Sequence, residues 1–466
     1  MQESKIGRRG ILGGALATAA VVPLAACAGG SSNNNNPDAA KTENKSADNP
    51  FGLAAGTKVE AVIFNGGYKT DYVDFAAGEM KKKFSDVSVE VKPSTQIAQE
   101  LQPRFVGGNP PDLIDNSGAG FIGFGSIADQ LETLDDVLNA NNYEGKPIKD
   151  TVFAGVKNPG TYNDRFVVLN YVLSVYGMWY SASLFEENGW TPPKTYEEAT
   201  ELGAKAKAKG KYLFLWGKEA ATYYLTSMLI SAFKEGGHDV RRAVENLEPN
   251  AWSQKPIQDV FKAMENIIKL GYMKPGGNGT QFTAAQAQWS NGQEALIYPS
   301  GAWIENEMKS QTKEGFKMTG MPELVLSSSP KLPYETLRAE AGEGFIVPSK
   351  AKNVAGGKEV LRAMLSKEAA TNFAKTRLAP TIVKDTVPED GFGSTALQSQ
   401  SKMLKDAGDN TFSIRFIFYY GMNKEQLVLL NSFLAGQSDT AALTKGLQAI
   451  SDRIAKDSSV KKIKID

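Results

Sequence analysis

The chain has 466 residues, of which 41% are hydrophobic and 22% are charged, so it is long enough for more than one buried core. Its 52 basic residues balance 52 acidic residues, which argues against nucleic acid as a partner, because phosphate binding needs clustered positive charge. One cysteine and one histidine exclude an intrachain disulfide, a cysteine-rich zinc site and most histidine-based catalysis. We therefore expect no metal and no cofactor.

The amino terminus is typical of an exported lipoprotein. Two consecutive arginines precede an apolar, small-residue stretch that ends directly before Cys27. This pattern predicts a signal peptide over residues 1–26, with the arginine pair of the twin-arginine export route. The sequence Leu-Ala-Ala-Cys resembles the bacterial lipoprotein box, whose cysteine carries a lipid; a secreted protein with a stray thiol is the alternative. Residues 27–56 are rich in Gly, Ser and Asn and predict a flexible tether.

Strand and helix patterns alternate after the tether. Apolar side chains first recur at every second residue and then at helical spacing. The expected order is strand 59–63, helix 71–84, strand 87–91, helix 96–106 and strand 112–115. Such alternation predicts a parallel sheet covered on both faces, and the loops at the carboxyl ends of its strands are where open α/β sheets bind ligands.

A second α/β unit follows. Residues 167–180 form a long apolar run that predicts a strand crossing between lobes. Thr195 and Glu198 have the spacing of a capping box that opens a helix. Further along the chain we expect helix 281–290, strand 294–298, a turn at 299–301 and a helix from 302.

Several segments, in a specific order along the chain, carry a resemblance to a known family. They are GGNPPD at 107–112, the run from WYS at 179 to PPKTY at 196, GQEALIYPSGAW at 292–303 and FLAG at 433–436. In these segments the chain resembles the solute-binding lipoproteins of bacterial carbohydrate ABC importers. A narrower likeness is to the actinobacterial components that bind N-acetylglucosamine and diacetylchitobiose. It is carried by SADNPFG at 46–52, the strand segment at 171–181, NLEPNAW at 246–252 and RAEAGEGFIVP at 338–348.

The resemblance implies a fold and a function. The fold would be α/β, a two-lobe clamp of the type II periplasmic-binding-protein kind, with mainly parallel sheets and a hinged cleft between the lobes. Lobe one would comprise residues 57–170 and 341–380, and lobe two residues 171–340 and 381–466. The protein would be a monomer and not an enzyme, held by its lipid on the extracytoplasmic face of the cell membrane. There it would capture N-acetylglucosamine and chitobiose-type sugars and deliver them to the ABC permease.

Trp303 is the first candidate for a ligand-binding residue. The family places a sugar-stacking aromatic residue in this Ser-Gly-x-Trp context, and an aromatic face offers rigid apolar area to a sugar ring. The alternative is a core tryptophan that packs its helix on the sheet. Tyr176, Trp216 and Tyr223 are weaker candidates for further pocket walls, and each fits the core equally well.

Polar candidates lie at predicted strand ends and crossings. Amides, carboxylates and hydroxyls together supply the donors and acceptors that sugar hydroxyls and an acetamido group need. The candidates are Asn65, Tyr68, Asp115 and Asn116 at strand ends, Glu343 at a crossing, and Arg415 and Tyr419 in the SIRFIFYYG segment. Turn formation or a hinge role is an equal alternative for any one of them.

Other functions stay open at this point. A membrane-anchored glycoside hydrolase would use two carboxylates, and four acidic residues are nominal partners: Asp112, Asp115, Glu340 and Glu343. A binding protein for a different sugar, or for a non-sugar solute such as a peptide or a polyamine, is the other alternative.

Overall fold

The computed structural model describes residues 45–118, 121–153, 155–458 and 460–465. The predicted signal peptide, the lipidation residue Cys27 and the tether up to residue 44 lie outside the described residues.

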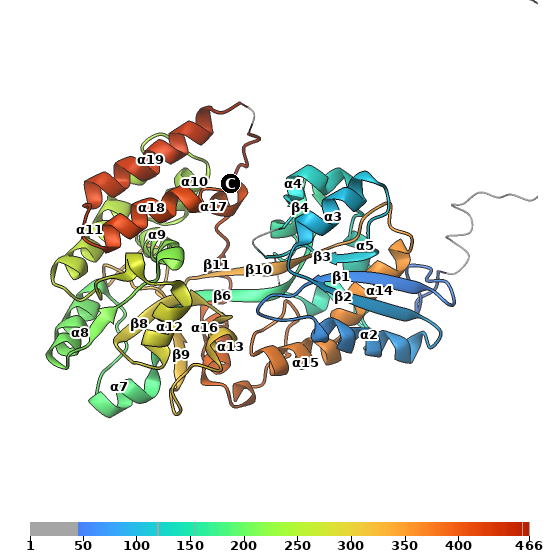
Figure 1. Ribbon diagram of the computed structural model, residues 1–466, viewed down its shortest axis with the longest axis horizontal. Helices are drawn as coiled ribbons and strands as arrows, with labels where there is room; N and C mark the ends of the chain where they lie inside the picture. Colours follow the sequence, from blue (N-terminus) through green and yellow to red (C-terminus); the bar gives the residue numbers. More distant parts are fainter. Residues whose placement is uncertain (1–44, 119–120, 154, 459, 466) are drawn as a thin grey trace, which may run out of the picture. The chain divides into compact units, whose positions relative to one another are not determined.

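Helices and short strands alternate along most of the described chain (Figure 1). The strands are β1 (Lys58–Phe64), β2 (Ser88–Ser94), β3 (Leu113–Asp115), β4 (Thr161–Tyr162), β5 (Arg165–Phe166), β6 (Leu169–Ser181), β7 (Tyr212–Phe214), β8 (Ala295–Gly301), β9 (Met318–Met321), β10 (Leu337–Ile346) and β11 (Thr411–Phe412). The longer helices are α2 (Asp71–Lys83), α3 (Ile97–Val106), α8 (Tyr196–Ala208), α9 (Thr222–Gly236), α10 (His238–Glu245), α11 (Lys255–Lys269), α12 (Phe282–Ser290), α14 (Val354–Met364), α15 (Lys367–Arg377), α16 (Thr395–Ala407), α18 (Asn423–Leu434) and α19 (Thr440–Lys456). The shorter helices are α4 (Phe124–Ile127), α5 (Asp135–Asn139), α6 (Ile148–Thr151), α7 (Ala182–Asn188), α13 (Ile304–Met308) and α17 (Phe416–Tyr419).

A mixed sheet runs in the order β2-β1-β3-β10-β6-β8-β7, with β9 and β11 added beside β6 and β10. At one end β1 pairs in parallel with β2 and β3, and at the other end β7 pairs in parallel with β8. The two long central strands, β6 and β10, are antiparallel to each other and to their neighbours β3 and β8. Local periodicity predicts the parallel ends, whereas the antiparallel centre arises from pairing between segments far apart in the sequence.

The first core lies around the β1–β2–β3 end of the sheet. Val59, Ala61 and Ile63 of β1 point to one face, where α2, α14 and α15 pack. Val62, between them, points to the opposite face and packs against α3. Side chains of a strand alternate between its two faces, so the predicted strand at 59–63 supplies both hydrophobic layers.

The second core surrounds α9, whose residues are buried on nearly every side. Helices α10, α11 and α18 pack against it, α19 packs on α11 and α18, and all contribute to one large hydrophobic cluster. A helix that is apolar all round is stable in water only as the centre of such a cluster. The capping box predicted at the start of α8 is confirmed, because the Thr195 hydroxyl accepts from the Glu198 backbone N–H and the Glu198 carboxylate accepts from the Thr195 N–H.

Strands β6 and β10 pass from one core to the other. Leu169 of β6 lies in the first core and Met178 in the second. The predicted lobe boundaries are a few residues off, because Tyr171 and Ile382, assigned to lobe two, pack in the first core. The Tyr171 hydroxyl donates to the Met364 carbonyl there at 3.0 Å.

The predicted tether is too long at its carboxyl end. Phe51 and Leu53 are only 7% and 5% exposed and belong to the first core. The Asn49 side chain closes this segment with hydrogen bonds to the backbone N–H and carbonyl of Leu53. Composition predicted a flexible segment to residue 56, but two large apolar side chains bury enough surface to order its end.

The predicted turn at 299–301 is wrong, since β8 continues through Gly301. Ser300 and Gly301 pair with Gly177 and Tyr176 of β6 and so remain in the sheet.

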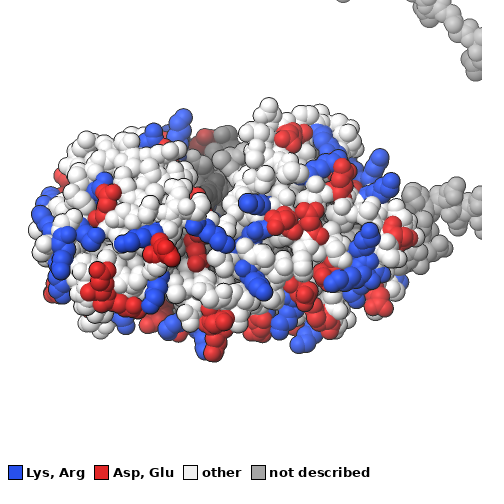
Figure 2. Space-filling model, turned by 60° about the horizontal axis from the view of Figure 1, so that its bottom comes forward, with Lys and Arg blue, Asp and Glu red and all other residues white. Residues whose placement is uncertain are grey.

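On the face drawn in Figure 2, Lys and Arg side chains are intermingled with Asp and Glu side chains. No helix within the described ranges combines the length and the apolar character needed to cross a membrane.

Candidate ligand-binding site

Three aromatic side chains meet where β6, β8 and α9 come together. Trp303 lies 5.4 Å from Tyr176 in an edge-on arrangement and 6.1 Å from Tyr223, measured between ring centroids. All three are partly exposed, as expected for rings that line a site and do not fill a core. We call Tyr176, Tyr223 and Trp303 the aromatic group.

The end of β8 positions Trp303. Gly301 pairs with Tyr176 across the β6–β8 ladder, and Trp303 follows two residues later, directly before α13. The Trp303 ring lies over Gly301 so closely that a Cβ atom there would come within 2.1 Å of it. Only glycine allows this approach, so the Ser-Gly-x-Trp motif sets the position of the ring.

The Arg338 side chain packs against Tyr176 of the aromatic group. The sequence patterns did not identify it as a candidate. Its guanidinium lies 3.7 Å from the centre of the Tyr176 ring, and it forms a buried ion pair with Glu340. Burial raises the pKa of the Tyr176 hydroxyl, and the nearby Arg338 opposes that rise. The signal in the sequence was the i, i+2 spacing of Arg338 and Glu340, which puts both side chains on one face of a strand.

A polar cluster lies at the carboxyl end of β3. Asp115 is fully buried, and it accepts hydrogen bonds from the Ser117 hydroxyl at 2.5 Å and from the Tyr72 hydroxyl at 3.4 Å. The carboxyl group of Glu343 in β10 lies close to that of Asp115, and each affects the pKa of the other. We call Asp115 and Glu343 the carboxyl pair. Glu343 has a φ of 55°, a conformation that costs free energy for a residue with a side chain and that is found most often at functional sites.

Tyr68 lies between the carboxyl pair and the aromatic group. Its side chain is 7% exposed, and its hydroxyl has no hydrogen-bond partner among the described residues. Burial raises the pKa of Tyr68, and the charge of Glu343 adds to the rise, so the two side chains lie close together. The Asn306 side chain of α13 donates to the Gly67 carbonyl at 2.6 Å, which joins the two sides of the site.

The remaining candidates divide into those near the site and those outside it. Asn65 is exposed at the end of β1, beside this cluster. Tyr419 is 36% exposed, and the Arg415 backbone N–H donates to Glu245. Burial raises the pKa of the Tyr162 hydroxyl; the charge of Arg415 opposes this rise and Tyr419 adds to it, so both residues face Tyr162.

Two candidates are not available to a ligand in this structure. Trp216 is 2% exposed in the second core, where its indole N–H donates to Asn431 and its ring covers Gly277. The Asn116 side chain is 2% exposed; its amide nitrogen donates to the Ile122 carbonyl and its oxygen accepts from the Ile122 N–H, both at 2.7 Å. Both expectations are therefore corrected: burial places Trp216 in the core, and Asn116 closes its own loop.

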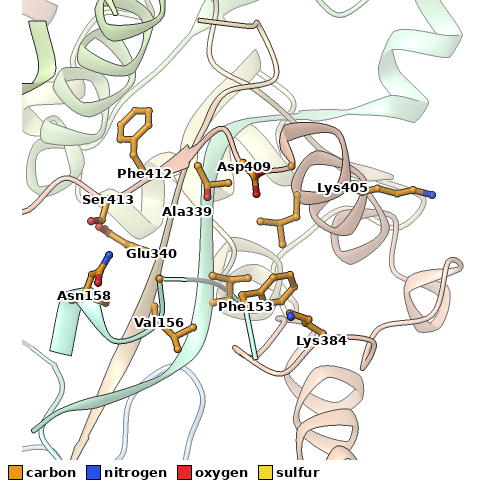
Figure 3. Close-up of a pocket in the computed structure, with 17 residues that line it drawn as sticks. Phe153, Val156, Asn158, Ala339, Glu340, Lys384, Lys405, Asp409, Phe412 and Ser413 are labelled. Atoms are coloured by element: carbon orange, nitrogen blue, oxygen red, sulfur yellow. The ribbon is translucent and has the colours of Figure 1, made fainter. Parts of the chain in front are cut away.

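A cavity of about 600 Å³ lies elsewhere, between the two cores (Figure 3). Leu173, Ala339 and Ala341 line it, together with Phe153 and Phe412. Glu340, the ion-pair partner of Arg338, also lines this cavity, whereas Tyr176, Tyr223 and Trp303 are not among its lining residues. We assign the site to the aromatic group and the carboxyl pair, because polar and aromatic side chains converge there at strand ends.

Within the described residues, no cluster of three or more His, Cys, Asp or Glu side chains could hold a metal ion. The aromatic group offers ring faces to a ligand and the polar cluster offers hydrogen bonds, which suits a ring-shaped polar molecule.

The chain is similar in sequence and in fold to known solute-binding proteins. The chain is 59% identical over its full length, and over 99% of the other protein, to the diacetylchitobiose-binding protein NgcE of Streptomyces coelicolor. Among solved structures it is similar to RafE, described from Streptococcus pneumoniae and solved in complex with raffinose, with a TM-score of 0.66 and 18% identity. That match covers 86% of this chain and 100% of the other. A chitin oligosaccharide binding protein matches with a TM-score of 0.64 and 15% identity over 86% of this chain and all of its own.

These structural likenesses confirm the predicted fold class, the two-lobe α/β fold of type II periplasmic sugar-binding proteins. The sequence profile of the bacterial extracellular solute-binding proteins matches residues 54–371, more than half of the chain. That match and the full-length relative place the protein outside the cytoplasm. The chain belongs to the family of bacterial extracellular solute-binding proteins.

Proposed function

We propose that the protein is the solute-binding component of a carbohydrate ABC importer, and that it captures N-acetylglucosamine and chitobiose-type sugars and delivers them to a membrane permease. The observation that carries this proposal is the full-length, 59% identical relative named for diacetylchitobiose binding. The site supports it, because an aromatic group opposite a polar cluster suits a sugar with one apolar face and several hydroxyls. The two lobes would close on the ligand about β6 and β10.

Calorimetric titration of the full-length chain tests the ligand. N-acetylglucosamine and its β-1,4 dimer should bind, and unacetylated glucosamine should bind markedly worse. Loss of the acetyl group leaves its partners unpaired in a desolvated cleft and introduces an ammonium group there. Equal affinity for glucosamine and N-acetylglucosamine would refute the amino-sugar assignment. A different sugar or a non-sugar solute would then be sought in a thermal-shift screen.

We propose further that the protein has no glycosidase activity. A glycoside hydrolase holds its two carboxyl groups roughly 5–10 Å apart so that the glycosidic bond lies between them. In the carboxyl pair the two groups lie close together, and Asp112 and Glu340 accept hydrogen bonds from the backbone N–H of Glu60 and from Arg338, respectively. Diacetylchitobiose incubated with the protein should be recovered unchanged by chromatography, and release of the monosaccharide would contradict this.

The last part of the proposal concerns location and assembly. We propose that Cys27 carries a lipid and holds a monomeric protein on the outer face of the cell membrane. Replacing Cys27 by serine should release the protein from membranes and leave sugar binding intact. A processed variant that still fractionates with membranes would refute the anchor.

A further inference from the structure

The carboxyl pair is built from two distant parts of the chain. Asp115 ends β3 beside Phe345 of the antiparallel strand β10, and Glu343 lies two residues before that partner. Asp115 is fully buried, and Glu343 holds its left-handed backbone conformation at this point. A fold rarely brings two carboxyl groups together inside a site unless their contact has a use.

A hydrogen bond between two carboxyl groups requires a proton on one of them. Burial raises the pKa of Asp115 well above its usual range, and the neighbouring Glu343 raises it further. Burial also raises the pKa of Glu343. The hydroxyls of Ser117 and Tyr72 donate to Asp115 and oppose part of the rise in its pKa.

Three tyrosine side chains, each from a different element, surround the carboxyl pair. Tyr72 faces it from α2, Tyr171 stacks on Tyr72 from β6, and Tyr68 faces it from the loop after β1. Burial raises the pKa of each of these three hydroxyls, so they stay neutral. Tyr176 and Glu307 of α13 also raise the pKa of the Tyr68 hydroxyl.

An unpartnered donor points from this cluster to a ligand. The Tyr68 hydroxyl is buried next to Glu343 and makes no hydrogen bond within the described part of the chain. Leaving such a buried group unpaired costs free energy, which a hydrogen bond to a ligand oxygen would recover.

We propose that Asp115 and Glu343 share one proton and act together as a specificity-determining pair, which binds a neutral hydroxyl or acetamido group of the sugar beside Tyr68. This inference rests on the proposed function. The shared proton supplies a donor and leaves acceptor oxygens free, so the pair can satisfy a group that both donates and accepts. Loss of the proton puts two negative charges side by side in a closing, desolvated site, and the affinity for a neutral sugar falls.

The test is the pH dependence of affinity, measured by calorimetry of the full-length chain with diacetylchitobiose. From about pH 5 to about pH 9 the wild-type Kd should rise about tenfold or more. Glu343→Gln should show a flat profile over this range, whatever its affinity at the lower pH, because an amide can hydrogen-bond to Asp115 and cannot ionise. Asp115→Asn offers the same amide from the other side and should also give a flat profile, should Glu343→Gln fold poorly.

Glu359→Gln is the matched control, a buried carboxyl in α14 that contacts Tyr143 and Arg362 and lies outside the site. Its affinity should keep the wild-type pH profile. A flat wild-type profile, or a Glu343→Gln profile as steep as that of the wild type, would overturn the inference. Absence of wild-type binding at every pH would instead overturn the proposed ligand, and the inference with it, so the two failures are distinguishable.

Discussion

The aromatic group and the carboxyl pair differ in how the protein holds them. The two rings are fixed by packing. The Trp303 ring lies over Gly301, and the Tyr176 ring lies against the Arg338 guanidinium. The carboxyl pair is fixed by hydrogen bonds, and beside it Tyr68 has a buried hydroxyl without a partner among the described residues. The aromatic group is therefore held in place without a ligand, whereas the polar side keeps a buried hydroxyl that a ligand could bind.

This difference separates two contributions to binding. A packed aromatic platform supplies apolar contact at low entropic cost, because its rings are already ordered. A polar cluster with an unsatisfied donor supplies selectivity, because a ligand lacking the matching group leaves it unpaired. Substitutions in the two regions should therefore change different measurable quantities.

The largest expected effect comes from a tryptophan outside the site. Trp216→Ala should lower the free energy of unfolding by about 3–5 kcal/mol, because it empties a core position and leaves Asn431 without its donor. The Kd for diacetylchitobiose of the folded protein should stay near the wild-type value. Urea unfolding and calorimetry check both, and a large loss of affinity with unchanged stability would place Trp216 in the site after all.

The pH dependence of stability should report the titration of Glu359, a buried carboxyl outside the site. Burial raises the pKa of Glu359 in the folded state to about 7, so its contribution to stability is complete below the ordinary carboxyl range and is lost as the pH rises toward 7. Glu359→Gln should therefore reduce the fall in urea midpoint between about pH 4.5 and about pH 7. If the urea midpoint of Glu359→Gln falls with pH as steeply as that of the wild type, the raised pKa of Glu359 is contradicted.

A smaller effect is expected from the glycine beneath the tryptophan ring. Gly301→Ala places a methyl group where the Trp303 ring lies and should displace the ring, weakening sugar binding about tenfold, or about 1.4 kcal/mol. Gly78→Ala in α2 is the control, because a Cβ atom there meets no other atom within 4 Å. Calorimetry of the two variants decides, and equal affinities would show that the ring position does not matter.

The smallest expected effect concerns the unpartnered hydroxyl. Tyr68→Phe should raise the ligand-free stability by about 1 kcal/mol, because it removes a buried donor that has no partner, and it should weaken sugar binding several-fold. Thermal unfolding and calorimetry measure the two changes. A loss of stability would mean that the hydroxyl is satisfied in the free protein.

Local patterns predicted much of the fold but little of its pairing. The alternation in β1, the spacing in α2 and the capping box of α8 depend on neighbours in the sequence, so they could be read directly. The antiparallel β6–β10 centre and the ordered segment around Phe51 depend on contacts with distant residues, which no local pattern reports.

The site shows the same limit. Strand ends and the Ser-Gly-x-Trp motif led to Asp115, Tyr68 and Trp303, because parallel strands collect their carboxyl ends at one edge. Residue type alone could not separate Trp303 from the buried Trp216, since both are tryptophans that follow strands. Arg338 was overlooked because a buried arginine acquires its role only from the ring it contacts.

The central claim is that a sugar binds against Trp303, and calorimetry of Trp303→Ala with diacetylchitobiose tests it most directly. Loss of the central aromatic contact should raise the Kd about thirtyfold, or about 2 kcal/mol, while the ligand-free protein loses much less stability than Trp216→Ala does. A Trp303→Ala protein that binds the sugar with wild-type affinity, and that is strongly destabilised without it, would contradict the account.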